Sequence, residues 1–131
     1  ILRYRRGRAL IYMGRLSQLK RDLACPGAEE LLRSCGYEHE NTEDILRQLR
    51  RRVCTCESFP HEIGLFLGYP LTDVLGFIQD GGKNSKCTGY WQVYGDEQDA
   101  QRRFKSYRKC SEVYIRLWNL GRSVQQLTVA A

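Results

Sequence analysis

The sequence predicts a single α+β domain in which a small antiparallel sheet packs with several helices and a long amphipathic helix lies near the C-terminus. Three observations predict this class. Two strand-like segments open the chain, helical periodicity fills its middle, and one alternating segment precedes a long final helical stretch. Because strands and helices do not alternate, a doubly wound parallel sheet is not expected. We expect the first hairpin and the later strand to share one sheet, with the long helix covering a face of it.

The first hairpin is predicted from strands at Ile1–Tyr4 and Ala9–Met13, joined by the Gly-containing loop Arg5–Arg8. A helix is predicted over Arg15–Leu23, because its leucines recur at helical spacing and Pro26 follows soon after. The opening of the chain is therefore a hairpin followed directly by a helix.

Two more helices complete the predicted first half. One covers Ala28–Cys35 and ends at Gly36, which suits the left-handed position after a helix. The next begins at Asn41 or Thr42, with acidic residues in its first turn, where the helix dipole favours them. Its predicted buried stripe consists of Ile45, Leu46, Leu49 and Val53.

The stretch from Phe59 to Ile78 has a different composition, with glycines and prolines among apolar residues. It predicts two short helices, His61–Leu67 and Leu71–Gln79, joined by a turn at Gly68–Pro70. Gly81–Lys86 is predicted to be a loop.

The last predicted elements are a strand at Tyr90–Tyr94, where aromatic and polar residues alternate, and a helix over Asp96–Asn119 that Gly121 ends. One face of this helix carries Ala100, Phe104, Tyr107, Tyr114, Leu117 and Trp118. This face is the one expected to cover the sheet.

Size and composition favour one domain over residues 1–131. No apolar run approaches the roughly 20 residues that span a bilayer, and the first residues lack the apolar stretch of a signal peptide. Six cysteines are too few for a disulfide scaffold, so reduced thiols in the cytoplasm are expected. Because the chain opens without Met, we expect a native N-terminal segment to be missing.

Two catalytic patterns are excluded. His61-Glu62 begins like a zinc-protease helix, but Leu65 stands where the second His is required. Gly81-Gly82-Lys83 begins like a phosphate-binding loop, but Phe77 occupies the place of its first Gly and Asn84 that of its hydroxyl residue.

A binding site is predicted where the Gly81–Lys86 loop leads into aromatic residues. Ammonium groups and backbone amides of the loop can hold an anion, and the rings can supply contact area or stack. The predicted ligand- or partner-binding residues are His61, Lys83, Asn84, Lys86, Tyr90 and Trp91. A plain structured turn before a strand explains the loop residues equally well, and local capping explains His61.

The thiols raise a second hypothesis, a metal or redox site. Cys54-x-Cys56 is a short chelating spacing, and the candidate ligands are Cys54, Cys56, His61, Cys87 and Cys110. Zinc and iron–sulfur pairs are usually spaced by about two to four residues. Separate buried or idle thiols are the simpler interpretation.

The net charge of +6 favours anionic partners, among them nucleic acid and acidic proteins. Two basic clusters contribute to it, around Arg50 and around Arg103. Each alternates with apolar residues at helical spacing, so each is either the solvated face of a helix or a docking surface that salt would weaken.

Several motifs together carry a family resemblance. They are His61–Pro70 (HEIGLFLGYP), Gly82-Lys83-Asn84 with Lys86-Cys87, Gly89-Tyr90-Trp91 and Val93-Tyr94-Gly95, and Arg116-Leu117-Trp118 with Gly121-Arg122-Ser123. With these the chain resembles an uncharacterised bacterial family, domain of unknown function 3793, over essentially its whole length.

The resemblance implies no assigned activity or cofactor. It places members in anaerobes near flavodoxin and iron-uptake genes, and it implies an earlier segment with a His-Cys pair that this chain lacks. We therefore expect a small binding or adaptor protein, not an enzyme, that meets an anionic ligand or an acidic protein such as a flavodoxin in iron or electron-transfer physiology. A thiol-based redox or metal protein is the alternative, nucleic-acid binding ranks last, and no membrane partner is expected.

Overall fold

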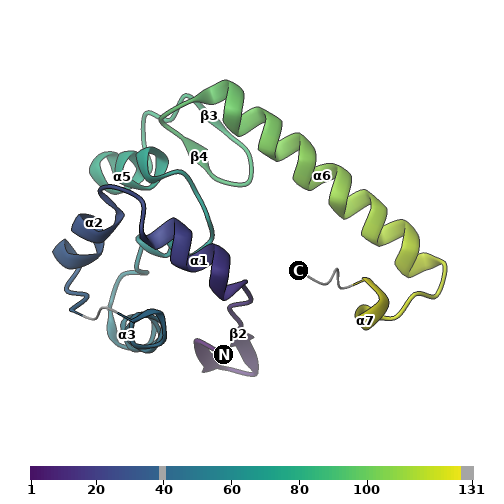
Figure 1. The fold of residues 1–131 in the computed structure, drawn as a ribbon, viewed down its shortest axis with the longest axis horizontal. Coiled ribbons are helices and arrows are strands. Elements are labelled where there is room, and N and C mark those ends of the chain that lie inside the picture. Colours follow the sequence, from purple (N-terminus) through teal and green to yellow (C-terminus); the bar gives the residue numbers. More distant parts are fainter. Residues whose placement is uncertain (39–40, 128–131) are drawn as a thin grey trace.

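The computed structural model describes residues 1–38 and 41–127, and it confirms the α+β class (Figure 1). The helices are α1 (Leu16–Leu23), α2 (Ala28–Ser34), α3 (Thr42–Thr55), α4 (Ile63–Phe66), α5 (Leu71–Asp80), α6 (Glu97–Asn119) and α7 (Val124–Leu127). The strands are β1 (Arg3–Arg5), β2 (Arg8–Leu10), β3 (Cys87–Thr88) and β4 (Gln92–Val93). Helices therefore dominate, and α4 is shorter than the predicted His61–Leu67 helix.

The prediction of one shared sheet is wrong, because β1–β2 and β3–β4 are separate two-stranded antiparallel hairpins. β1 lies against α3, where Arg3 donates from Nη1 to the carbonyl oxygen of Val53 at 3.2 Å. β4 instead contacts α5. The two hairpins thus lie against different helices.

The turn of the first hairpin is also tighter than predicted. Arg5 pairs with Arg8, which leaves Arg6 and Gly7 as a two-residue turn where a four-residue loop was expected. Both turn residues have positive φ, 51° and 75°, as the hairpin turns that match strand twist require.

In the second hairpin, Cys87 pairs with Val93 and Thr88 with Gln92. The predicted strand at Tyr90–Tyr94 is therefore shortened to Gln92–Val93, because Tyr90 and Trp91 lie in the turn. There they project toward α6 and α5 instead of extending a sheet.

The larger hydrophobic cluster, here called the helical core, joins the N-terminal segment to α1 through α5. Leu49 and Val53 of α3 are among its most enclosed large side chains, at 0% and 2% exposure. Asn41 caps α3 by accepting a hydrogen bond from the backbone N–H of Asp44 at 2.9 Å. The predicted stripe is confirmed, with Ile45, Leu49 and Val53 buried and Leu46 packed against them.

A smaller cluster, the aromatic core, lies between the second hairpin and the start of α6. It consists of Trp91, Val93, Ala100 and Phe104. Tyr69, from the turn between α4 and α5, packs against both clusters and so connects them.

Helix α6 covers the second hairpin with its first turns only. Asp96 caps the helix by accepting from the N–H of Asp99 at 2.9 Å, and this bond lowers the pKa of the Asp96 carboxyl. Farther along, Tyr107, Tyr114 and Trp118 are 42%, 43% and 57% exposed, so the predicted covering face is wrong beyond the first half. In Figure 1 the helix runs away from the body formed by α1 to α5.

The described helices include none that is long and apolar enough to cross a bilayer.

Candidate ligand pocket

A pocket of about 410 Å³ opens between α4, α5 and the turn of the second hairpin. It is called the aromatic pocket here, because five of its lining residues are Phe, Tyr or Trp. Its ring-bearing side chains are Phe59, His61, Tyr69, Phe77, Tyr90 and Trp91. A volume in the range of about 300–1,000 Å³ with mainly apolar walls is typical of small-ligand sites.

Trp91 forms the inner wall. Its ring stacks on Tyr69 with centroids 4.8 Å apart and meets Phe104 edge-on at 4.5 Å. With 7% of its surface exposed, Trp91 is mainly a core residue. Tyr90, the next residue in the turn, is 49% exposed and leans on Tyr107 at 5.4 Å. Of the two predicted contact residues, Tyr90 therefore offers more surface to a partner.

The buried carboxylate of Asp73 holds this wall in place. One oxygen accepts the Trp91 indole N–H at 2.7 Å. The other accepts the backbone N–H groups of Tyr94 and Gly95 at 2.9 and 2.7 Å. Because Asp73 is only 2% exposed, these three donors replace the water that its charge would otherwise need. α5 and the hairpin are thereby joined as one rigid wall.

Two glycines permit the close approach of the pocket's elements. A Cβ on Gly64 would come within 2.8 Å of Val74 on α5, and a Cβ on Gly89 would overlap the ring of Phe104. The glycines of the Phe59–Gly95 stretch therefore serve packing at these positions.

His61 lies at the open side of the pocket, exposed, with its ring edge-on to Phe77 at 4.9 Å. Its neighbour Glu62 is buried elsewhere, where its Oε1 accepts from Arg52 Nε at 2.6 Å and from the Tyr37 hydroxyl at 3.2 Å. Burial, followed by the charge of Glu62, raises the pKa of Tyr37 well above its ordinary range. The two neighbours therefore have different roles: His61 lies at the pocket, and Glu62 forms a structural ion pair with Arg52.

The two predicted lysines of the loop between α5 and β3, Lys83 and Lys86, have different environments. Asn84 adopts a left-handed φ of 59°, and the carbonyl oxygen of Lys83 accepts the Tyr94 hydroxyl at 2.8 Å. Lys86 donates from Nζ to the carbonyl oxygen of Gly95 at 2.6 Å, beside the start of α6. Within the described chain, the Lys83 ammonium has no hydrogen bond or ion pair, so it is the lysine available to a ligand.

Comparison with known proteins identifies one relationship. The family model described as "Protein of unknown function (DUF3793)" matches residues 1–128. The chain belongs to this family. No curated protein and no solved structure matches it.

In this DUF3793 chain the predicted metal ligands are dispersed. Cys54 lies at the end of α3, where its thiol is 3.4 Å from the carbonyl oxygen of Leu2, while Cys87 lies in β3 and Cys110 in α6. The described residues contain no group of three or more His, Cys, Asp or Glu side chains that could hold a metal ion. His61 lines the aromatic pocket, whereas Cys54 and Cys56 lie at the end of α3 and do not line it.

The thiols nearest the two cores, Cys35 and Cys87, both have a raised pKa. Burial raises the pKa of Cys35, with the charge of Glu62 adding to the effect. Partial burial also raises the pKa of Cys87, although Gln101 donates to its sulfur at 3.5 Å. Because the thiolate is the reactive form, a raised pKa reduces reactivity at neutral pH.

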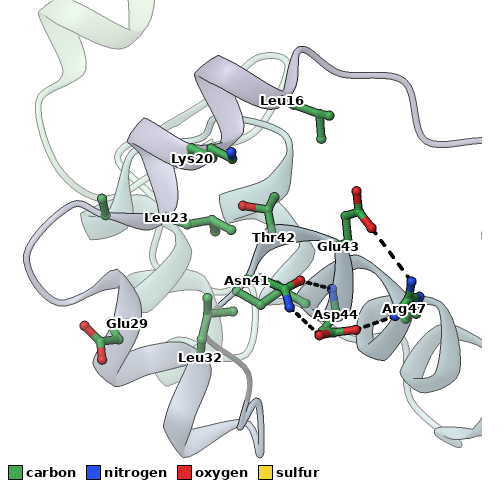
Figure 2. Close-up of a pocket in the computed structure, with 12 residues that line it drawn as sticks. Leu16, Lys20, Leu23, Glu29, Leu32, Asn41, Thr42, Glu43, Asp44 and Arg47 are labelled. Atoms are coloured by element: carbon green, nitrogen blue, oxygen red, sulfur yellow. Dashed lines mark hydrogen bonds and ion pairs between the residues drawn. The ribbon is translucent and has the colours of Figure 1, made fainter.

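A larger cavity of about 910 Å³ lies among α1, α2 and the start of α3 (Figure 2). Its floor carries Leu23 and Leu32, and its rim carries the ion pairs of Arg47 with Asp44 at 2.5 Å and with Glu43 at 3.8 Å. Residues 39–40 directly precede its lining residues Asn41 and Thr42 and lie outside the described chain. We therefore place no site there.

The sequence analysis missed three residues that build the aromatic pocket: Phe59, Tyr69 and Phe77. It also assigned no role to Asp73. The sequence carries no signal for it, because an acid on an amphipathic helix is ordinarily solvated, and only the structure shows that Asp73 is buried.

Proposed function

We propose that this chain is a non-enzymatic binding module that takes an apolar ring of an anionic ligand or partner into the aromatic pocket. The observation that carries the proposal is the lining itself, in which rings from α5 and the second hairpin surround about 410 Å³ beside a lysine-bearing loop. Flat apolar walls favour ring-shaped groups, since aromatic pairs gain about 0.5–1.5 kcal/mol beyond their buried area.

A preformed site supports tight binding, because less side-chain freedom is lost when the ligand enters. The three hydrogen bonds to Asp73 and the stacking of Trp91 on Tyr69 fix the inner wall before any ligand arrives. The outer residues, Phe59 at 44% and Leu67 at 48% exposure, can adjust around it.

Anion recognition falls to Lys83 in this proposal. Gly82, its neighbour, packs against the Phe77 ring at the edge of the pocket, where an added Cβ would lie 3.1 Å from that ring. Lys86 is instead committed to Gly95. The net charge of +6 would further attract an anionic partner.

Binding without catalysis is proposed because the two buried acids, Asp73 in the pocket wall and Glu62 outside it, are occupied by structural contacts. Asp73 accepts three hydrogen bonds, and Glu62 is paired with Arg52. Neither is oriented as a free general acid or base.

The finer assignments from the family resemblance remain proposals: a cytoplasmic location, an acidic flavodoxin as the partner, and a role in iron or electron-transfer physiology. The positive charge supports an acidic partner in general. The thiol and nucleic-acid hypotheses stay predictions, because no described contact favours either.

The test uses 8-anilinonaphthalene-1-sulfonate, which carries aromatic rings and one negative charge, in a fluorescence titration of the whole chain. We expect Phe59→Ala and Lys83→Glu each to weaken binding several-fold, since the first removes a ring that lines the pocket and the second reverses a charge in the loop that follows α5. The matched controls are Ile78→Ala, an exposed position on α5 outside the pocket, and Lys105→Glu, an exposed position on α6. Equal affinity in all four variants would contradict the proposal.

A further inference from the structure

The first hairpin carries positive charge that the described chain does not neutralise. Residues 1–15 contain five arginines but no lysine, aspartate or glutamate. Arg5, Arg6 and Arg8 are exposed, and within residues 1–38 and 41–127 no ion pair or side-chain hydrogen bond involves them. Figure 1 shows the hairpin at the edge of the molecule, beside α3 and far from the second hairpin. These three side chains are therefore available to an anion from outside the chain.

A groove of about 630 Å³ lies on this hairpin and is lined mainly by arginine. Its lining residues are Arg3, Arg5, Arg6, Arg8, Ala9 and Leu10. Because side chains alternate between the two faces of a strand, the opposed pairs Arg3–Leu10 and Arg5–Arg8 lie on the same face. Arg3 donates to the carbonyl oxygen of Val53 and so fixes the hairpin on α3. The groove is thus a basic surface in which the other three guanidinium groups have no partner within the described chain.

The placement of these arginines opposes the stability of the hairpin itself. Arg5 and Arg8 are directly opposite each other, and like charges at opposed positions destabilise a strand pair. Arg6 takes a left-handed φ of 51°, where Asn or Gly is usual in a two-residue turn. Departures from such local rules are expected where residues serve binding. The hairpin therefore suits an external anion, which would relieve the repulsion between Arg5 and Arg8.

The positive surface continues onto α3. The thiol of Cys54 lies 3.4 Å from the carbonyl oxygen of Leu2, so this side of α3 faces the segment that leads into β1. Arg50 is one turn before Cys54 on the same side, is exposed, and has no ion pair among the described residues. The acids of α3 lie in its first turn at the other end, and Glu57, which follows α3, forms no ion pair in the described chain. Unpaired arginines are thus spread over two elements, an arrangement that matches a repeating anion better than a single one.

We propose that the first hairpin binds the phosphate groups of double-stranded DNA from within its major groove. The major groove of DNA is about 12 Å wide and admits a two-stranded β-ribbon, which is the form of β1–β2. Guanidinium groups match phosphate oxygens with two parallel hydrogen bonds, which accounts for arginine in place of lysine. A ribbon placed there would carry Arg5, Arg6 and Arg8 at its tip toward the phosphates on either side, and Arg50 would meet the backbone beside it.

Other nucleic acids match the surface less well. Single strands are held largely by stacking on aromatic rings, but the arginine face of the hairpin carries no ring, and Tyr4 lies on the other face. Double-stranded RNA has a deep, narrow major groove that side chains cannot read. The inference rests on charges that lack a partner within the described chain, and not on a contact inside it or on the aromatic pocket.

The test is fluorescence anisotropy of a labelled DNA duplex of about two helical turns, roughly 20 base pairs, titrated with the whole chain. We expect micromolar binding at low salt. Three phosphate contacts give a slope of about −2.7 in log affinity against log salt, so binding should weaken at least roughly 40-fold between about 50 and 200 mM salt.

Variants locate the surface. Arg8→Glu should weaken DNA binding at least tenfold, while Arg108→Glu, which makes the same charge change at an exposed position of α6, should weaken it much less. Arg50→Gln should weaken binding and reduce the salt slope by about 1, as the loss of one phosphate contact requires. Arg5→Lys keeps the charge but loses the paired hydrogen bonds, so it should bind more weakly with an unchanged salt slope.

Stability separates a binding role from a structural one. Arg6→Asn suits the left-handed φ, and Arg8→Glu replaces repulsion with attraction to Arg5. Both variants should therefore keep or raise the urea midpoint of unfolding while they weaken DNA binding. A lower midpoint in both, together with lost binding, would show that the arginines hold the hairpin and would contradict the inference.

Several other results would overturn it. These are no binding of the DNA duplex, equal weakening by Arg108→Glu, or equal binding of a Glu-rich peptide. Tighter binding of single-stranded DNA, or of vesicles rich in an anionic phospholipid, would assign the surface to that partner instead. Phe59→Ala should leave DNA binding unchanged, and Arg8→Glu should leave the binding of 8-anilinonaphthalene-1-sulfonate unchanged, so failure of this inference is distinguishable from failure of the proposed function.

Discussion

The helical core and the aromatic core are stabilised by different means. The helical core buries thirteen residues, mostly aliphatic, contributed by Leu2, Tyr37 and α1 through α5. The aromatic core buries four, around one tryptophan whose indole N–H is bound by a buried carboxylate. The first depends on buried area, and the second depends on directional contacts at defined positions.

This difference accounts for the glycines and aromatic residues that are concentrated between Phe59 and Gly95. Aliphatic packing tolerates exchange among residues of similar volume. The contacts of Asp73 with Trp91, or of Gly89 with Phe104, tolerate few alternatives, because each depends on a particular donor or on a missing Cβ. Some residues of this stretch that resemble a functional motif are therefore needed for packing.

Leu49→Ala tests the helical core and should have the largest effect. The side chain is fully buried in α3, so its loss removes hydrophobic burial and leaves a cavity, at a cost of about 2–5 kcal/mol in the free energy of unfolding. Urea denaturation followed by circular dichroism measures it. The matched control is Leu16→Ala, a 54% exposed leucine on α1, which should cost far less. A loss below about 1 kcal/mol for Leu49→Ala would show that this cluster is not the main source of stability.

Asp73→Ala tests the directional contacts of the aromatic core and should rank second. It leaves the Trp91 indole and two backbone N–H groups without their acceptor, and each such donor costs about 1–3 kcal/mol when it stays dry. We expect a loss of about 2–3 kcal/mol, because water can reach part of the opened site. Tryptophan fluorescence should shift to longer wavelength as Trp91 becomes hydrated.

Asp73→Asn separates the two halves of that network. Its remaining oxygen can still accept from Tyr94 and Gly95, while its amide group cannot accept from the indole. It should therefore lose less stability than Asp73→Ala. Equal losses in the two variants would mean that the indole contact alone matters.

Much of the fold could be predicted from the sequence where local patterns decide it. The stripe of α3 and its start at Asn41 or Thr42 are local features, and both are confirmed. The separation of the two hairpins could not be predicted, since strand partners are chosen by contacts distant in the sequence. The prediction that the apolar face of α6 is covered along its whole length was wrong for another reason. Periodicity shows that a helix is amphipathic, but it does not show how far along the helix the packing partner extends.

The structure brings only some of the predicted binding residues together. His61, Tyr90 and Trp91 do line one pocket, whereas Lys86 is turned to a backbone carbonyl beyond it. Nothing in the sequence distinguishes Lys83 from Lys86, because the difference depends on which lysine can reach the Gly95 oxygen. The contacts of the buried acids could not be predicted either, since the partners of Glu62 and Asp73 lie 10 or more residues away in the sequence.

Tyr37→Phe gives the smallest expected effect and tests whether the helical core also depends on a polar contact. At neutral pH it removes the hydrogen bond to the Glu62 carboxylate, which at 3.2 Å we place at the low end of the range for charged acceptors, about 1.5 kcal/mol. Its clearer signature lies in alkali. Burial raises the pKa of Tyr37, so the folded chain keeps this proton while the unfolded chain releases it above about pH 10. Stability is then fully present below that pH and falls as the pH rises further.

Removing Tyr37 should therefore make the alkaline loss of stability less steep, measured as the urea midpoint between about pH 8 and pH 11. Tyr12→Phe is the matched comparison, because burial also raises the pKa of Tyr12, but its side chain is only half-buried and donates to the Phe66 carbonyl at 2.8 Å. Its effect on the alkaline slope should be smaller. If Tyr37→Phe leaves the slope unchanged, the Glu62 contact is not kept dry, and the helical core is stabilised by aliphatic burial alone.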